Sequence, residues 1–240
     1  MIVPMSYRKI YGKLFKDGVS IDDVRQGNIG NCWIVSTIAA MAKHNAAFIR
    51  SKVQAHPDGT YKVSYYKRVW YWPFGVKRTV TVDNKVLLDG AATRLDANDP
   101  DIWFPIMEKA YAASVGGYEN IMKGGVAYDV FDWLTGRMPK IFWSASKVSL
   151  KDIEENAGKP MVAETAGFGF KPIPGLIKQH AYAVLGVDNG KVVIFNPWGH
   201  TEVGSDGVDD GFFKLTIEQF RESFARFYVC RYKWFTNNGL

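Results

Sequence analysis

The hydrophobic and polar residues of this chain follow two patterns, and the change between them falls near residues 137–140. Before this point, residues 61–72 and 77–82 alternate as half-buried strands of a hairpin around a Pro-Phe-Gly turn. Apolar stretches with helical character predict three helices, at residues 34–42, 102–114 and 127–135. The first part of the chain is therefore expected to be mostly helical.

Strands dominate the second part, where short apolar runs recur between turn signals. They are predicted at residues 161–165, 180–187, 191–195, 211–215 and 225–232. Two short helices interrupt them. One begins near Ser149, and the other has a capping-box pattern with Thr216 at N-cap and Gln219 at N3. The pattern predicts an α+β fold without internal repeats.

The composition is typical of a soluble enzyme. The 240 residues are 47% hydrophobic and 15% aromatic, which is enough for one sizeable core or two smaller ones. The N-terminus lacks the apolar stretch of a secretory signal, and no apolar run is long enough to span a bilayer. We therefore expect a cytoplasmic protein without a membrane partner.

The formal net charge of +6 permits an acidic partner but does not require one. The basic and aromatic residues at 61–72 would suit single-stranded nucleic acid, yet their alternation favours a solvated hairpin, so no nucleic-acid partner is expected. His44, His56 and His200 have no metal-ligand spacing, and there is no Cys and His cluster for zinc.

Cys32 is the first candidate for chemistry, because it follows a glycine-bearing turn and directly precedes the apolar stretch at 34–42. A cysteine in the first turn of a helix faces unpaired backbone N–H groups, which favour the thiolate. Gln26 could donate its side-chain amide to an oxyanion beside the sulfur. The alternative is a buried structural cysteine, as we expect for Cys230. A disulfide between the two would inactivate Cys32 and is not expected.

His180 and Asn196 supply the groups that a nucleophilic cysteine needs. Their separations from Cys32 are close to the roughly 130–150 residues of papain-like proteases, and the order Cys, His, Asn is also theirs. Each has a structural alternative: His180 opens a buried strand, and Asn196-Pro197 could simply form a turn. Taken together with Gln26, the set favours a catalytic site.

These residues also resemble the signature segments of the calpain protease core. The three segments are Gln26-Gly27-x-x-Gly30-x-Cys32-Trp33, His180-Ala181-Tyr182 and Asn196-Pro197-Trp198-Gly199. The likeness continues through residues 104–112 and 117–119 and through 210–230, so that it covers about residues 20 to 232. Ordered segments over most of the chain are far more specific than one Gly-x-Cys-Trp motif.

The resemblance implies a papain-like, two-lobe calpain protease core. It divides the chain into an N-terminal segment (1–19), a helical lobe with Cys32 (20–138) and a β-rich lobe with His180 and Asn196 (139–240), with the cleft between the lobes. It implies a monomer that acts on a protein or peptide substrate. Backbone atoms of Gly124, Gly125 and Gly136 would hold that substrate. Trp198 would shield the His180 and Asn196 pair, or serve as a core tryptophan below the cleft.

The resemblance also implies calcium. Asp23 and Glu119 match the acidic ligand positions of the first lobe, while Glu202 and Asp210 match those of the second. The second-lobe pattern is eroded, because its loop is shorter than usual and Phe212 stands where the family has a further acid. We therefore expect the first-lobe site to dominate. Two further departures are Ile21 in place of an arginine that links the lobes, and Asn31 in place of the aspartate before the cysteine.

Three functions remain open from the sequence. The first is an intracellular cysteine endopeptidase. The second is an acyl-transfer enzyme of the transglutaminase kind, which commonly has an aspartate as its third residue, so that Asn196 argues against it. The third is a catalytically silent calpain-like binding module, which the intact set of Cys32, His180, Asn196 and Gln26 disfavours.

Overall fold

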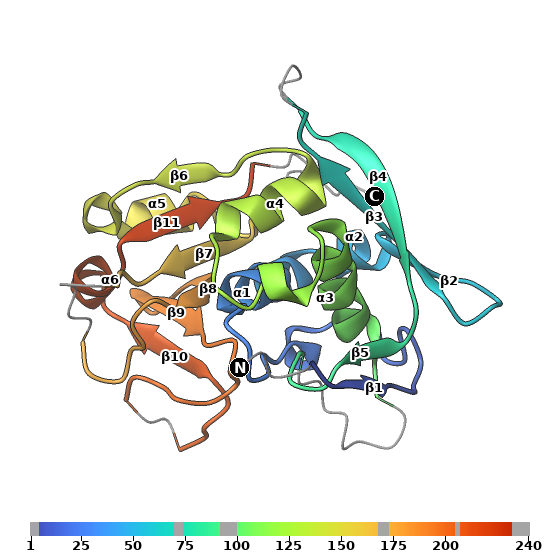
Figure 1. The fold of residues 1–240 in the computed structure, drawn as a ribbon. Coiled ribbons are helices and arrows are strands. Elements are labelled where there is room, and N and C mark those ends of the chain that lie inside the picture. The colour runs from blue at the N-terminus through green and yellow to red at the C-terminus, as the bar shows by residue number, and fades with distance from the viewer. Residues whose placement is uncertain (1–4, 70–73, 92–99, 168–172, 205–206, 232–240) are drawn as a thin grey trace.

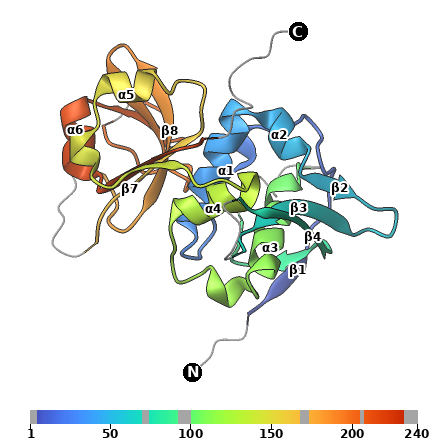
Figure 2. The same ribbon diagram turned by 90° about the horizontal axis from the view of Figure 1, so that it is seen from above.

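The computed structural model of the protein describes residues 5–69, 74–91, 100–167, 173–204 and 207–231. Two lobes lie side by side: a lobe of helices with two small sheets, in blue to green, and a lobe built on one large sheet, in yellow to red (Figures 1 and 2). This is the α+β architecture that the sequence predicts.

The helices are α1 (Cys32–His44), α2 (Ala46–Arg50), α3 (Trp103–Ser114), α4 (Ala127–Thr135), α5 (Leu150–Glu154) and α6 (Ile217–Ser223), with short 3₁₀ turns η1 (Ile21–Asp23), η2 (Tyr118–Asn120) and η3 (Ala145–Lys147). The strands are β1 (Tyr7–Lys9), β2 (Val53–Ala55), β3 (Tyr61–Lys67), β4 (Val76–Val82), β5 (Lys85–Leu87), β6 (Lys140–Phe142), β7 (Met161–Glu164), β8 (Ala181–Asp188), β9 (Lys191–Phe195), β10 (Phe212–Leu215) and β11 (Arg226–Val229).

Helix α1 is the centre of the molecule. Ten consecutive residues, from Trp33 to Ala42, are buried, because α1 packs against α2 and α4 on one side and against β7 and β8 of the other lobe on the other. A helix that is apolar on all sides is stable only when it is covered on all sides. Figure 2 shows α1 next to β8, where the two lobes meet. The first residue of this helix is Cys32.

The helical lobe contains the expected hairpin. Strands β3 and β4 pair from Tyr61 opposite Val82 to Lys67 opposite Val76, and β2 extends the sheet on the other side of β3. The sequence also predicted strand character beyond Lys67, but residues 70–73 lie outside the described part of the chain. The hairpin packs against α3 and α4.

The β-rich lobe has one antiparallel sheet with the strand order β10-β9-β8-β7-β11-β6. All five strands predicted after residue 140 are present in it, and β6 is an additional edge strand. The two short helices have their expected caps: the hydroxyls of Ser149 and Thr216 accept the N–H groups of Asp152 and Gln219, respectively.

The N-terminal segment belongs to the helical lobe. Strand β1 pairs antiparallel with β5, with Tyr7 opposite Leu87, and Ile10 is part of the buried core of that lobe. Residues 7–10 of the predicted N-terminal segment 1–19 therefore pack against the helical lobe. Short strands of three residues carry too little alternation to be recognised from sequence.

A separate core lies under the outer face of the large sheet and is built from residues 145–229. The inner face of that sheet joins the core of the helical lobe through Val162, Ala183 and Phe195. The lobes are thus packed along one continuous apolar seam. Among the helices of the described ranges, none has both the length and the apolar character needed to cross a membrane.

Candidate active site

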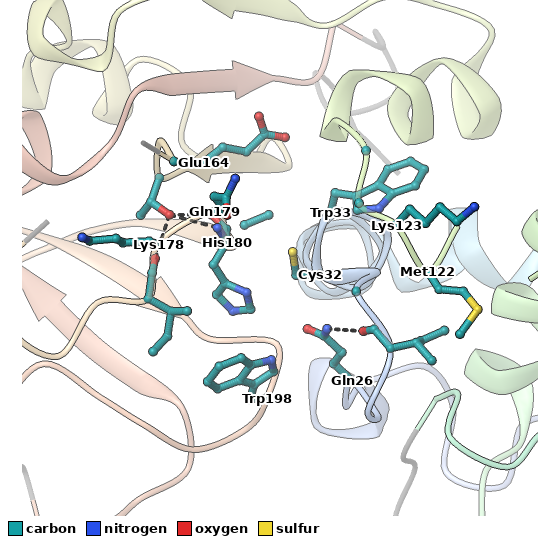
Figure 3. Close-up of a pocket in the computed structure, with 18 of the residues that line it drawn as sticks. Gln26, Cys32, Trp33, Met122, Lys123, Glu164, Lys178, Gln179, His180 and Trp198 are labelled. Atoms are coloured by element: carbon teal, nitrogen blue, oxygen red, sulfur yellow. Dashed lines mark hydrogen bonds between the residues drawn. The ribbon is translucent and has the colours of Figure 1, made fainter. Parts of the chain in front are cut away.

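A cavity of about 980 Å³ separates the two lobes at the start of α1. Figure 3 shows Cys32 and Trp33 on the wall that belongs to the helical lobe, and Glu164, His180 and Trp198 on the opposite wall. The predicted nucleophile and the predicted base therefore face one cleft from different lobes, although they are far apart in the sequence.

The position of Cys32 follows from the turn that precedes α1. The carbonyl of Asn31 accepts the N–H groups of Ile34 and Val35 and so opens the helix, and Gly30 forms a bridge with Lys123 of a neighbouring loop. A side chain on Gly30 would meet the carbonyl of Met122 at 2.6 Å, so only glycine allows this approach. Cys32 is consequently held at the first helical position, partly exposed to the cleft.

His180 and Asn196 form a direct pair, with His180 Nε2 and Asn196 Oδ1 3.0 Å apart. Both side chains are buried. The amide of Asn196 is oriented by two further bonds, because its Nδ2 donates to the carbonyls of His200 and Thr201. Its Oδ1 must then accept from the imidazole, which assigns the ring proton to Nε2 and leaves Nδ1 of His180 as the basic nitrogen.

Cys32 and His180 are not hydrogen-bonded to each other in the described structure. Burial raises the pKa of the Cys32 thiol to about 11, although backbone hydrogen bonds with Ala181 and Trp33 oppose the shift. Burial likewise lowers the pKa of His180 to about 4, opposed by the bond to Asn196. The sequence led us to expect that the helix N-terminus would favour the thiolate. In the structure the loss of solvent opposes that influence and favours the neutral form of both groups.

Gln26 lines the cleft on the same side as Cys32 (Figure 3). Its Nε2 donates to the carbonyl of Ile29 at 2.7 Å, which leaves the second N–H of that amide without a bond to the described residues. Its backbone N–H donates to Pro197 of the other lobe at 2.8 Å, directly after Asn196. Its Oε1 has no partner among the described residues and lies on the cleft side of the amide in Figure 3, while its main chain connects the two walls.

The Trp198 ring packs against the His180 ring. Its ring centroid lies 4.7 Å from that of His180, with the planes inclined by 53°. The side chain is half-buried and lines the cleft. Trp198 is therefore a residue of the cleft wall, in contact with the imidazole.

The three glycines proposed for substrate binding separate into two groups. Gly124 and Gly125 are exposed and line the cleft, and Gly125 lies so close to the Trp33 ring that a side chain would meet it at 2.5 Å. Gly136 lies outside the cleft. It ends α4 with a φ of 71° and packs against Tyr66, so helix termination accounts for a glycine at this position.

The first-lobe calcium residues lie on separate 3₁₀ turns. Oδ2 of Asp23 accepts from Ser20 N at 2.9 Å and from the Trp103 indole at 2.9 Å, and burial raises the pKa of this carboxyl. Two neighbouring acids, Asp101 and Asp22, raise the pKa of Asp23 further. Glu119, the other predicted ligand of this lobe, is exposed. Since Asp23 Oδ1 accepts no hydrogen bond from the described residues, it remains a possible ligand.

The second-lobe residues fit a cation poorly. Glu202 Oε1 already accepts the backbone N–H groups of Asp210 and Gly211, each at 2.7 Å, and Asp210 Oδ1 accepts from Phe212 N. The carboxylates hold the loop directly. Across the described ranges, no group of three or more His, Cys, Asp or Glu side chains is arranged to bind a metal ion.

Two buried carboxyl groups near the site were not singled out from the sequence. Glu108 of α3 accepts from the Asn31 side chain, directly before the nucleophile. Glu164 of β7 accepts from Ala127 N, the first residue of α4, and from the Tyr228 hydroxyl, so that it links the two lobes at the cleft wall. Each is an acidic residue inside an otherwise apolar segment of the sequence. This pattern could have identified both as buried carboxyl groups, because acids are rarely buried without a partner.

Comparison with known proteins identifies the family. The family described as calpain family cysteine protease matches residues 6–206. Similar curated proteins are human calpain-14, which is 25% identical over 87% of this chain, the bovine calpain-1 catalytic subunit, 26% over 89%, and the calpain clp-1 of Caenorhabditis elegans, 24% over 91%. The matches cover 36%, 35% and 33% of those proteins, so this chain spans about a third of their length. The cleft, with its cysteine, histidine and asparagine brought together from two lobes, is thus the site of a chain that belongs to the calpain family of cysteine proteases.

Proposed function

We propose that the chain is a cysteine endopeptidase in which Cys32, His180 and Asn196 form the catalytic triad and Gln26 stabilises the oxyanion. The observation that carries this proposal is the orientation of His180. Asn196 holds the Nε2 proton, and Asn196 is itself held by two carbonyls of its own loop, so the basic Nδ1 is the nitrogen left for Cys32. A merely structural histidine would not need this double constraint.

Catalysis would begin with transfer of the thiol proton from Cys32 to Nδ1 of His180. The sulfur forms a bond to the peptide carbonyl carbon, and the carbonyl electrons move to its oxygen. When the tetrahedral intermediate collapses, the C–N bond breaks and the imidazolium donates its proton to the leaving amine. Water then attacks the thioester with His180 as the base, which releases the acid and restores the thiol.

Because burial favours the neutral form of both partners, we infer that bound substrate promotes formation of the ion pair. Bound substrate excludes water and brings the developing negative charge under the donors of the site. With its amide turned toward the cleft, the Gln26 side chain would donate an N–H to the oxyanion together with the backbone N–H of Cys32, each donor being worth roughly 3–4 kcal/mol in the transition state. Trp198 would keep water from the His180 and Asn196 bond.

We propose calcium only for the first lobe, where Asp23 would be a ligand together with Glu119 and backbone carbonyls. A bound calcium ion would neutralise acidic side chains and fix the loop that leads to Gln26. The calcium ion would take no part in the reaction itself, which Cys32, His180, Asn196 and Gln26 would carry out. Both cysteines are free thiols, which supports action in a reducing compartment such as the cytosol.

The experiment that tests this function is the incubation of the purified chain with an unfolded, casein-like protein. We expect new amino termini to appear, and we expect both Cys32→Ala and alkylation by iodoacetamide to abolish them. Release of ammonia and incorporation of an amine without new termini would instead indicate an acyl transferase. Binding of the unfolded protein with no reaction would indicate a silent module.

A further inference from the structure

A second cavity, of about 370 Å³, lies next to the cleft on the side of the helical lobe. It shares Trp33, Gly124 and Gly125 with the cleft, so the Gly124–Gly125 strip separates the two spaces. The strip is exposed and has no side chains, which leaves its backbone accessible to a peptide. Successive side chains of an extended peptide point to opposite faces. A peptide that runs along this strip would direct one side chain into the cleft and the next into the second cavity.

Aromatic rings form one wall of the second cavity. Trp33 and Tyr111 are packed edge to face with centroids 5.5 Å apart, Tyr111 and Trp133 lie 5.1 Å apart, and Trp133 stacks on Tyr65 at 5.5 Å. The row is held rigidly, since the Trp133 indole also donates to Ser114 Oγ at 2.9 Å. A preformed row of rings of this kind attracts planar or cationic groups.

Carboxylates from α4, the helix that also carries Trp133, line the second cavity as well. Asp132 is engaged by Arg68, whose Nε lies 3.0 Å from Asp132 Oδ2 and whose NH2 contacts Oδ1. Asp129, one helical turn earlier, is hydrogen-bonded to the Tyr128 side chain but has no ion pair with any residue of the described chain. Burial is the main cause that raises the pKa of Asp129; the charges of Asp132 and Glu164 raise it further, and a hydrogen bond with the Tyr128 side chain opposes the shift. The carboxylates of Asp129 and Asp132 give this part of the cavity lining its negative charge.

The basic residues around the cavity do not reverse this charge. Arg68 is neutralised by its two contacts with Asp132, and Lys67 is exposed at the end of β3. The Arg68 and Asp132 pair also shows that a guanidinium is accommodated at this wall in a bidentate arrangement. Asp129 is left as the carboxylate available to a ligand beside the aromatic row.

We propose that this second cavity binds the guanidinium of a substrate arginine, with Asp129 as its counter-ion and the Tyr65, Trp133 and Tyr111 rings as its apolar support. This proposal rests on the proposed peptidase function, because the arginine belongs to the same peptide whose neighbouring residue occupies the cleft. It assigns to the chain a preference for basic substrates.

Binding can be measured separately from cleavage. The protein would carry Cys32→Ala, and the probes would be acetylated hexapeptide amides with arginine at each position in turn, each paired with a peptide that has citrulline at that position. Citrulline keeps the planar shape and loses the charge. By calorimetry we expect arginine to bind about tenfold more tightly than citrulline at one position, and less so at about 0.5 M salt.

Variants of Asp129 identify the site. Asp129→Asn should bring the ratio of the two dissociation constants close to one, whereas Asp129→Glu should retain the preference. Glu222→Gln, which removes the same charge from an exposed position of α6, should behave like the parent protein. Near-ultraviolet circular dichroism would verify that each variant is folded. If Asp129→Asn does not fold, the Glu variant and the salt dependence still decide.

Three results would overturn the proposal: arginine and citrulline bind equally at every position, Asp129→Asn keeps the preference, or none of the peptides binds at millimolar concentration. The peptidase function is judged separately, from cleavage of the same peptides by the protein with Cys32 intact. If the protein binds arginine preferentially but cleaves none of the peptides, the binding site is supported and the peptidase function is contradicted.

Discussion

Asn31 Nδ2 donates a hydrogen bond of 2.8 Å to Glu108 Oε2, and both side chains are completely buried. Asn31 opens α1 directly before Cys32, and Glu108 lies in the middle of α3. The same carboxyl interacts with the backbone of Ala91, and the carbonyl of Asp89, two residues earlier, accepts from the backbone N–H of Asn28. Glu108 therefore connects the nucleophile helix with the loop that follows Gln26. It is a positioning residue, since it acts on the site only through these neighbours.

We predict that Glu108 makes the stability of the protein depend on pH. Burial raises the pKa of Glu108 from 4.5 to about 7, so the folded protein holds a proton that the unfolded chain releases. The free energy of unfolding should fall as the pH rises from about 4.5 to about 7, by about 3 kcal/mol from this group alone. Urea unfolding at pH 5 and pH 8 would measure the difference.

Glu108→Gln should remove most of that pH dependence, because the amide has no proton to lose. The structure offers the new amide an acceptor, since Asn31 Oδ1 is buried without a partner in the described structure. Glu222→Gln is the matched control and should keep the wild-type pH dependence. An unchanged pH dependence in Glu108→Gln would mean that other groups are responsible.

The triad residues should act as one unit. Cys32→Ala and His180→Ala should each lower kcat by about 10⁴-fold or more, and the double variant should be no worse than either single variant. Asn196→Ala should be milder, at about 100-fold, because the proton path survives and only the orientation of the ring is lost. Turnover of an unfolded protein would be measured for all four. If Asn196→Ala leaves kcat unchanged, another group must orient the His180 ring.

Much of this site could be predicted from the sequence, because its signals are local. The turn before Cys32 and the Asn-Pro segment at Asn196 are each encoded within about eight residues. The hairpin at β3 and β4 and the capping boxes of α5 and α6 follow from equally local patterns. Where the pattern was local, the elements were found.

What could not be predicted depends on contacts between distant segments. The raised pKa of Cys32 arises from burial against the other lobe and opposes the local influence of the helix N-terminus. The pairing of β1 with β5 joins residues far apart in the chain, and the position of Gly136 depends on Tyr66 of the hairpin. Glu164 is identified only when β7 meets the start of α4.

The resting state of the thiol leads to a prediction on alkylation. Because burial raises the pKa of Cys32 to about 11, its reaction with iodoacetamide should accelerate about tenfold per pH unit between about pH 6 and pH 9. His180→Ala should change this profile little, since burial keeps the imidazole neutral at these pH values. Peptide mapping by mass spectrometry would separate Cys32 from Cys230. A rate independent of pH between about 5 and 8, and lost in His180→Ala, would instead demonstrate an ion pair at rest.

The second lobe should hold its loop without calcium. Glu202→Ala leaves the N–H groups of Asp210 and Gly211 without their acceptor and should lower stability by about 1–3 kcal/mol, whereas Glu202→Gln keeps an acceptor oxygen. Thermal unfolding with and without calcium would test this. If both variants lose the same stability and added calcium reverses the loss, this loop does contain a metal site.

Calcium binding, where it occurs, should depend on Asp23. Asp23→Asn is the informative variant, because an amide oxygen can still accept from Ser20 N and from the Trp103 indole while the negative charge is lost. If a cation is bound there, Asp23→Asn and Glu119→Ala should weaken calcium binding in calorimetry and lower turnover together. Full activity of the wild-type protein in excess chelator would contradict calcium dependence. In that case the bond from Gln26 N to Pro197 O and the contact of Glu164 with Ala127 would be sufficient to hold the two walls of the cleft in their working positions.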